Sequence, residues 1–334
     1  MEIRKRVLTT LNHRQPDKIP YNINFTLAAR EKMVKYYNDP EFDKKLGNCF
    51  CKLSTEPDGA WQEIKPDIWR DQFGVHWDRS VDKDIGVVCN TAITAETFDE
   101  FVFPNPNDPS RYAAYSKIIK DNPHGLYFSS IGFSLFERAW TLTGMENLLM
   151  YMITDPDFVH RLMDKILDFN LRIIERACSF DIDIMHFGDD WGQQNGLIMG
   201  ADMWREYIKP RVKKMYGLAR SKDKFVSIHS CGKIDEIFPD LIECGLNIFN
   251  PFQPEVIDVA KMKETFGQSL TFYGGISTQQ TLPYGTPAQT RDEVRRLLDV
   301  VGKNGGYIAS PAHDTPADAR PENIAAMIDV LQNQ

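Results

Sequence analysis

The sequence has little that would place the chain in a membrane or outside the cell. No stretch approaches the roughly 18 consecutive apolar residues that a membrane-spanning helix needs. The first residues, Met1 to Arg6, are not followed by an apolar run, so we expect no signal peptide. Only six cysteines occur in 334 residues, and their spacing shows no disulfide framework. These absences together predict a protein of the reducing cytoplasm.

The chain also lacks the clustered lysines and arginines that nucleic-acid binding requires. Its formal net charge is −8 at pH 7, which argues against nucleic acid as the main partner. The composition is otherwise that of an ordinary globular protein, with 42% hydrophobic and 26% charged residues. A chain of this length buries a large core, and α/β barrels of this size often form one domain.

The apolar pattern alternates between short and long segments. Short runs of apolar, β-branched and aromatic residues are followed by longer stretches of helical period, which is typical of parallel βα units. Helical stretches are expected over residues 145–180, interrupted at Asp155-Pro156, and over residues 321–331, which begin with proline. An eighth strand is expected in a weak segment, in addition to seven over residues 19–25, 126–131, 184–187, 225–228, 247–250, 270–273 and 306–309.

This alternation predicts an α/β fold, namely a (β/α)8 TIM barrel that occupies residues 1–334 as a single domain. The pattern changes between about residues 61 and 109. There, residues 73–79 and 85–89 are expected to pair as a hairpin across the polar turn 82–84, and a proline-rich segment follows. We interpret this region as a small insertion that decorates the barrel.

Residues with ligand or acid–base chemistry gather after the predicted strands. In α/β barrels the active site lies at the carboxyl ends of the strands. The opposite ends of the predicted strands carry no comparable cluster. We therefore expect the site among the residues that follow five of the strands, which include Asp189, Asp190, Trp191, His229, Cys231, Phe252, Gly274 and His313.

His229 and Cys231 are the candidate metal ligands. Residues two apart in an extended chain point the same way, so both side chains can reach one ion. Imidazole and thiolate are typical zinc ligands. Taken alone, the pair is more typical of a histidine at the barrel rim beside a buried thiol. His313 and the acidic pair Asp189-Asp190 are expected at the same end of the barrel, and together these residues favour a metal site.

Asp189 and Asp190 are adjacent, so they cannot easily point in one direction. We expect one of them to act in the site, as a ligand or by hydrogen-bonding a ligand or the substrate. The other is expected to cap a helix or hold a loop. Substrate-binding walls are expected from four aromatic residues and Gly274, although barrel packing and a tight turn are the alternatives; the aromatic residues are Phe133, Trp191, Phe252 and Tyr273.

Several motifs along nearly the whole chain resemble those of the uroporphyrinogen decarboxylase superfamily, and this resemblance implies a (β/α)8 barrel. They are Arg4-Lys5-Arg6-Val7-Leu8, Pro16-Asp17-Lys18-Ile19-Pro20, Phe136-Glu137-Arg138-Ala139-Trp140, Gly144-Met145-Glu146-Asn147-Leu148, His229-Ser230-Cys231-Gly232, Gly274-Gly275-Ile276, Tyr284-Gly285-Thr286-Pro287 and Pro321-Glu322-Asn323-Ile324.

Within this superfamily the chain is more similar to the corrinoid-dependent methyltransferases than to the decarboxylase itself. The decarboxylase has an arginine-rich segment near its N-terminus, whereas residues 22–30 here retain only Arg30. The methyltransferases carry a zinc-binding His-x-Cys pair, which His229 and Cys231 match, followed by a third ligand. His313 stands where coenzyme M enzymes have a cysteine, and this departure favours the O-demethylase type by analogy.

The resemblance implies a zinc-dependent methyltransferase that moves a methyl group between a small methylated compound and a corrinoid protein, with a methoxylated aromatic favoured as that compound. The chain shows no Asp-x-His-x-x-Gly cobalamin motif, so the corrinoid is expected on a separate partner protein. Alternative functions are a metal-free decarboxylase, a methylcobalamin:thiol methyltransferase, and a non-catalytic barrel that binds a corrinoid protein.

Overall fold

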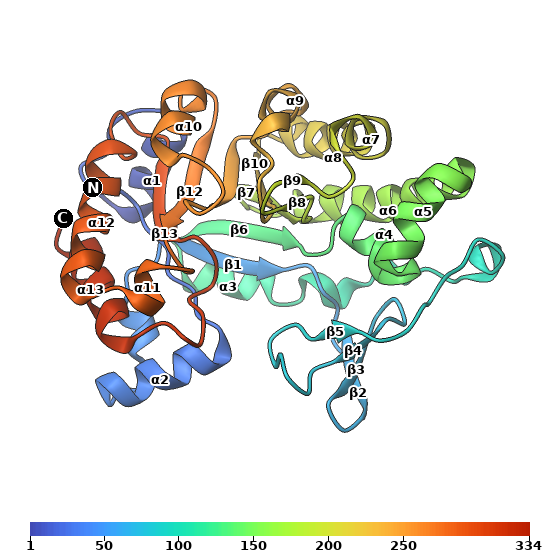
Figure 1. The fold of residues 1–334 in the computed structure, drawn as a ribbon, viewed down its shortest axis with the longest axis horizontal. Helices are drawn as coiled ribbons and strands as arrows, with labels where there is room; N and C mark the ends of the chain where they lie inside the picture. The colour runs from blue at the N-terminus through green and yellow to red at the C-terminus, as the bar shows by residue number, and fades with distance from the viewer.

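The computed structural model describes residues 1–334 and is built around a curled parallel sheet (Figure 1). The seven strands follow one another in the order β1-β6-β7-β10-β11-β12-β13, and every neighbouring pair is parallel. Such pairs require crossover connections, which the helices supply. The strands are β1 Phe50–Ser54, β6 Leu126–Ile131, β7 Ile184–Gly188, β10 Phe225–His229, β11 Ile248–Phe252, β12 Thr271–Ile276 and β13 Tyr307–Pro311.

The two edges of this sheet are joined by residues 19–25. This segment was predicted as a regular strand but forms only isolated bridges, between Tyr21 and Ala309 and between Phe25 and Thr315. On the side of β1, the backbone N–H of Cys49 donates to the Tyr21 carbonyl oxygen at 3.1 Å. The segment thus occupies the gap between β13 and β1, and the predicted barrel architecture is confirmed. The further strand expected in a weak segment of the sequence is β1.

The predicted interruption of the long helical stretch is confirmed at Asp155, whose side chain accepts from Phe158 N–H at the start of α6. The closing helix is also confirmed. No helix combines the length and apolar character needed to cross a membrane. The helices are α1 Ile3–Leu11, α2 Leu27–Tyr37, α3 Tyr115–Asp121, α4 Phe136–Thr143, α5 Met145–Thr154, α6 Pro156–Ala177, α7 Ala201–Met203, α8 Lys209–Ser221, α9 Phe238–Cys244, α10 Val259–Phe266, α11 Thr281–Tyr284, α12 Pro287–Val300 and α13 Pro321–Gln332.

Shorter elements complete the chain. They are the strands β8 Gly192–Gln193 and β9 Gly196–Leu197, the π-helical turn η4 Trp204–Ile208, and the 3-10 turns η1 Phe42–Lys45, η2 Phe98–Glu100, η3 Pro109–Tyr112 and η5 Asp235–Ile237.

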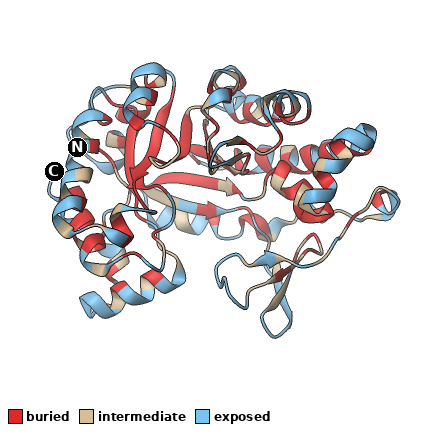
Figure 2. Ribbon diagram, viewed as in Figure 1, coloured by how far each residue is buried: buried red, intermediate tan, exposed pale blue.

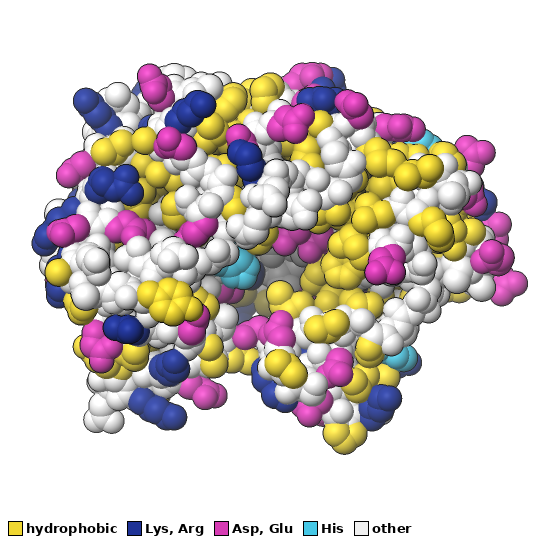
Figure 3. Space-filling model, viewed as in Figure 1, with side chains coloured by type: hydrophobic (Ala, Val, Ile, Leu, Met, Phe, Trp, Pro, Cys, Tyr) yellow, Lys and Arg dark blue, Asp and Glu magenta, His cyan; other side chains and the backbone are white.

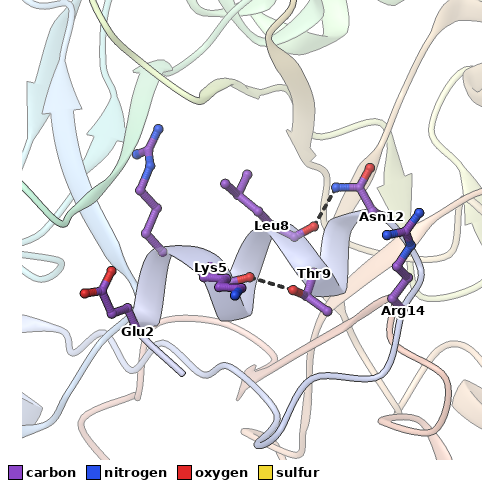
Figure 4. Close-up of a pocket in the computed structure, with 7 residues that line it drawn as sticks. Glu2, Lys5, Leu8, Thr9, Asn12 and Arg14 are labelled. Atoms are coloured by element: carbon purple, nitrogen blue, oxygen red, sulfur yellow. Dashed lines mark hydrogen bonds between the residues drawn. The ribbon is translucent and has the colours of Figure 1, made fainter.

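Helix α1 plugs the amino-terminal end of the barrel. Val7 and Leu11 are buried in a small core with side chains from inside the sheet, and strands β11, β12 and β13 are buried throughout (Figure 2). A shallow hollow runs along the outer side of α1 (Figure 4). Its Thr9 hydroxyl and Asn12 amide donate to carbonyl oxygens of the same helix, so these groups are already satisfied. The open end of the barrel is therefore the carboxyl end.

The insertion forms a four-stranded antiparallel sheet beside the barrel (Figure 1). The predicted hairpin is present, because Trp77 pairs with Val88 across β4 and β5. Two further strands precede the hairpin and were not predicted. The turn of the hairpin is tethered to the barrel by Asp84, whose carboxylate accepts from the backbone N–H of Leu27 at 3.0 Å. The strands are β2 Trp61–Lys65, β3 Ile68–Asp71, β4 His76–Asp78 and β5 Val87–Val88.

Candidate metal centre

The carboxyl ends of the strands surround an open cavity of about 390 Å³. In Figure 3 this cavity is the central hollow of the molecule, with a histidine at its rim and acidic side chains inside it. Only five of its 21 lining residues are hydrophobic. The cavity lies at the end of the barrel where the sequence predicted the site, and its wall includes Asp190, His229 and His313.

Three predicted ligands converge in this region. The ligand atoms of His229, Cys231 and His313 all lie within 4.8 Å of one another, and His229 Nε2 is 3.3 Å from Cys231 Sγ. Ligand atoms around tetrahedral zinc are about 3.5 Å apart, given bonds of about 2.1 and 2.3 Å. The pair at the end of β10 already has that spacing. His313 follows β13 in an exposed loop, and it would complete the set if its ring moved by about 1 Å.

Asn250, in the middle of β11, sets the tautomer of His229. The Asn250 amide nitrogen donates to the Tyr273 carbonyl oxygen at 2.9 Å, so the amide oxygen is the atom that faces His229 Nδ1 at 2.6 Å. An amide oxygen only accepts, and Nδ1 must therefore carry the proton. The lone pair then lies on Nε2, the atom beside Cys231 Sγ. Metal-binding histidines are typically oriented in this way.

Cys231 is positioned through its backbone, and its surroundings disfavour the thiolate. Its N–H donates to Asp190 Oδ1 at 2.8 Å. Burial, and then the negative charge of Asp190, raises the pKa of the Cys231 thiol. A bound divalent cation reverses this balance, because it stabilises the thiolate directly. The two histidines and this thiol are a donor set that zinc accepts, so the site fits the metal predicted from the sequence.

The structure separates the two adjacent aspartates. Asp189 is fully buried, and its carboxylate accepts from the backbone N–H groups of Phe136 and Glu137 at the start of α4 and from the Trp191 indole at 2.7 Å. Burial raises the pKa of Asp189 to about 6, and these hydrogen bonds oppose that rise. Asp189 thus holds a helix terminus, as one of the pair was expected to do. Asp190 lines the cavity.

The predicted substrate-binding residues are placed differently from one another. Phe133 and Tyr273 line the cavity, and Phe133 has a φ of 48°, a left-handed conformation that is costly for an aromatic residue. Trp191 and Phe252 do not line it, because both are fully buried in the protein core. Trp191 packs against Trp204, and Phe252 stacks on Phe272.

Gly274 also lies outside the cavity wall. Its φ is 136°, and a side chain there would meet the backbone nitrogen of Phe252 at 2.6 Å. The glycine therefore allows β11 and β12 to approach each other closely. The expectation that Trp191, Phe252 and Gly274 form pocket walls is wrong, because these residues pack neighbouring elements of the barrel together.

Sequence reasoning missed several residues that line the cavity, among them Asn250 and Glu137. Asn250 is a polar residue in a buried strand, and only its place at the end of the strand predicted over residues 247–250 could have signalled it. Glu137, near the start of α4, lines the cavity. Burial, followed by the charges of Asp190 and Asp189, raises the pKa of Glu137 well above its usual range. Its only signal in the sequence was the motif Phe136–Trp140.

A family model described as uroporphyrinogen decarboxylase (URO-D) matches residues 82–334. The chain belongs to this family. A methylated-thiol–coenzyme M methyltransferase of Methanosarcina mazei is 22% identical over 197 residues, which cover 58% of this chain and 49% of that protein. A methylcobamide:CoM methyltransferase of Methanosarcina barkeri is 20% identical over 190 residues, which cover 57% of this chain and 53% of that protein. The matched part of this chain thus spans about half the length of each of these two relatives.

Uroporphyrinogen decarboxylases match this URO-D family member at a similar level of 20–23% identity. Among solved structures, a methyltransferase from Methanosarcina mazei superimposes with a TM-score of 0.75 at 16% identity, covering 100% of this chain and 99% of that one. This likeness shows that the two chains share a fold along their whole length.

Replacing Asn250 with alanine is expected to weaken zinc binding by about 10–100-fold, because His229 loses the partner that orients its ring. Competition with a chromophoric chelator measures this change. Asn90→Ala is a matched control, since Asn90 is an asparagine of the insertion that hydrogen-bonds backbone groups of β4 and the Gly74 turn. Equal zinc affinity in the Asn250→Ala variant and the unmodified protein would rule out the orienting role.

Proposed function

We propose that this protein is a zinc-dependent, corrinoid-linked methyltransferase. The observation that carries the proposal is the convergence of His229 Nε2 and Cys231 Sγ, 3.3 Å apart, with His313 beside them at the mouth of a barrel. Support also comes from the methyltransferases among the relatives of the chain. Zinc held by these three residues would supply a Lewis acid for the heteroatom that carries the methyl group.

The protein's own residues prepare the cavity for this chemistry. Asn250 keeps the proton on His229 Nδ1, which leaves Nε2 free to bind. Asp190 holds the backbone of Cys231 through its N–H. Burial raises the pKa of Glu137, whose side chain lines the same cavity. Phe133 and Tyr273 provide aromatic surface in the same wall.

We further propose that the methyl donor is a small methoxylated compound, with an aromatic ether favoured. The bond between the methyl carbon and the ether oxygen breaks, and the oxygen leaves as an alkoxide or phenoxide. The methyl carbon bonds to the cobalt(I) centre of a separate corrinoid protein, which supplies the electron pair. Two histidines and one cysteine make a less electron-rich site than one with two cysteines, and this favours activation of an ether oxygen over activation of a thiolate.

The test is to mix the protein with a reduced corrinoid protein and a panel of methoxyarenes, methylamines and methylated thiols, and to follow formation of methylcobalt by its absorbance. Methyl transfer is expected from methoxyarenes. Transfer from thiols or amines alone would overturn the substrate and leave the zinc site standing. That outcome has a specific basis, because one relative is a methylated-thiol enzyme. Decarboxylation of a porphyrinogen by metal-free protein would overturn the whole proposal.

A further inference from the structure

A second cavity opens beside the candidate metal centre. It lies between strand β5 of the insertion and helices α4 and α5, has a volume of about 780 Å³, and is here called the side cleft. Eight of its 13 lining residues are hydrophobic, in contrast to five of 21 in the central cavity. Its walls include Trp77, Val87, Val88, Trp140 and Met145. Its size and character are those of a binding site for a small apolar ligand.

The side cleft adjoins the central cavity. Ile85, Phe133 and Glu137 line both, so a group bound in one space lies next to the other. Figure 3 shows apolar side chains along the wall of the central hollow that faces α4 and the insertion. Phe133 forms the shared wall in its left-handed backbone conformation, and its ring packs on Trp77 with centroids 5.0 Å apart.

The wall formed by the insertion is held in place at both ends. At one end β5 pairs with β4 through Trp77 and Val88. At the other end Asp84 tethers the hairpin turn to the first residue of α2. Nevertheless Val87 and Ile85 remain 67% and 47% exposed, although both are large hydrophobic residues. Apolar surface that is pre-positioned yet left open to solvent is typical of interaction sites, which include ligand-binding grooves and protein interfaces.

The geometry of an ether indicates which group could bind in this cleft. An ether oxygen bears two carbon groups, which diverge from it at a wide angle. If the oxygen lies at His229, Cys231 and His313, and the methyl group faces a corrinoid protein at the barrel mouth, then the second carbon group must leave sideways. Residues that are not hydrophobic make up most of the lining of the central cavity, whereas hydrophobic residues make up most of the lining of the side cleft. An aryl group gains more by entering the cleft, because burial of apolar surface is favourable.

We propose that the side cleft binds the aryl part of the methyl donor, while the central cavity holds its methoxy group. The naming of this ligand rests on the proposed function. The cleft would then select donors by the shape of their apolar part, and the barrel mouth would remain free for the corrinoid partner.

The experiment measures binding of anisole by calorimetry to the full-length zinc-loaded protein and to two variants. Val87→Trp places a large side chain in the cleft from an exposed position of β5. Val81→Trp is the matched control, because Val81 is 91% exposed in the same insertion and lines neither cavity. Val87→Trp is expected to weaken anisole binding by about tenfold. Val81→Trp is expected to bind anisole as the unmodified protein does, and both variants are expected to keep the same zinc content.

Methyl transfer from anisole, measured alongside, separates this proposal from the proposed function. Weaker anisole binding in Val87→Trp supports the subsite even if no methoxyarene donates a methyl group. Unchanged anisole binding in Val87→Trp overturns it even if methyl transfer proceeds, and so does a failure of the unmodified protein to bind anisole. Loss of corrinoid-protein binding with unchanged anisole binding would also overturn it, because the cleft would then be a docking surface for the partner.

Discussion

Replacing Cys231 with serine or His229 with alanine is expected to reduce bound zinc from about one ion per chain to a small fraction of that, and to abolish methyl transfer in parallel. Each variant removes one of three converging ligands, and a serine hydroxyl does not ionise as a thiol does. The zinc content is measured by elemental analysis after purification without chelators and with zinc supplied.

Two control variants separate loss of the site from general damage. Cys89→Ser removes an exposed free thiol of the insertion that lines the side cleft, and it is expected to keep full zinc occupancy. His124→Ala removes an exposed histidine before β6, and it is expected to keep full zinc occupancy and full activity. An unmodified protein that holds no zinc under these conditions would refute the metal centre, and the metal-free decarboxylase alternative would then gain support.

Asp189→Asn is expected to lower the stability of the fold, whereas Asp190→Asn is expected to lower methyl transfer. At position 189 an amide NH2 group would face backbone N–H donors of α4 and the Trp191 indole, all of which now share one carboxylate. Loss of these charge-assisted hydrogen bonds is expected to lower the free energy of unfolding by about 3 kcal/mol. The change is measured by denaturant titration.

At position 190 the asparagine oxygen still accepts from the Cys231 N–H, so the stability of the fold is expected to change little. The negative charge beside the three ligands is lost, however, and methyl transfer is expected to fall by about 100-fold. Full turnover by the Asp190→Asn variant would show that Asp190 serves only to hold the loop.

Much of the barrel follows from the sequence, because strand and helix periods are local properties. The buried strands β6, β7, β10, β11, β12 and β13 are short apolar runs, and Asp155-Pro156 stops one helix and starts the next. Strand β1 was not predicted, because Phe50–Ser54 has a lysine and a serine among its five residues and only Leu53 is buried. Residues 19–25 have the composition of a strand, yet only two of them form bridges.

The sequence by itself determined the end of the barrel at which to look and the pair His229 and Cys231, because ligand-type residues follow the strands and residues two apart share a direction. Tertiary structure alone decided which aspartate caps a helix, since the backbone N–H groups that Asp189 accepts from at the start of α4 lie 52 to 54 residues away. It likewise placed Asn250 of β11 beside His229 of the neighbouring strand β10, and it placed Glu137 of α4 in the wall of the cavity. It also turned Trp191 and Phe252 into the core. Contacts between residues so distant in sequence depend on how the strands and helices pack, which no local pattern records.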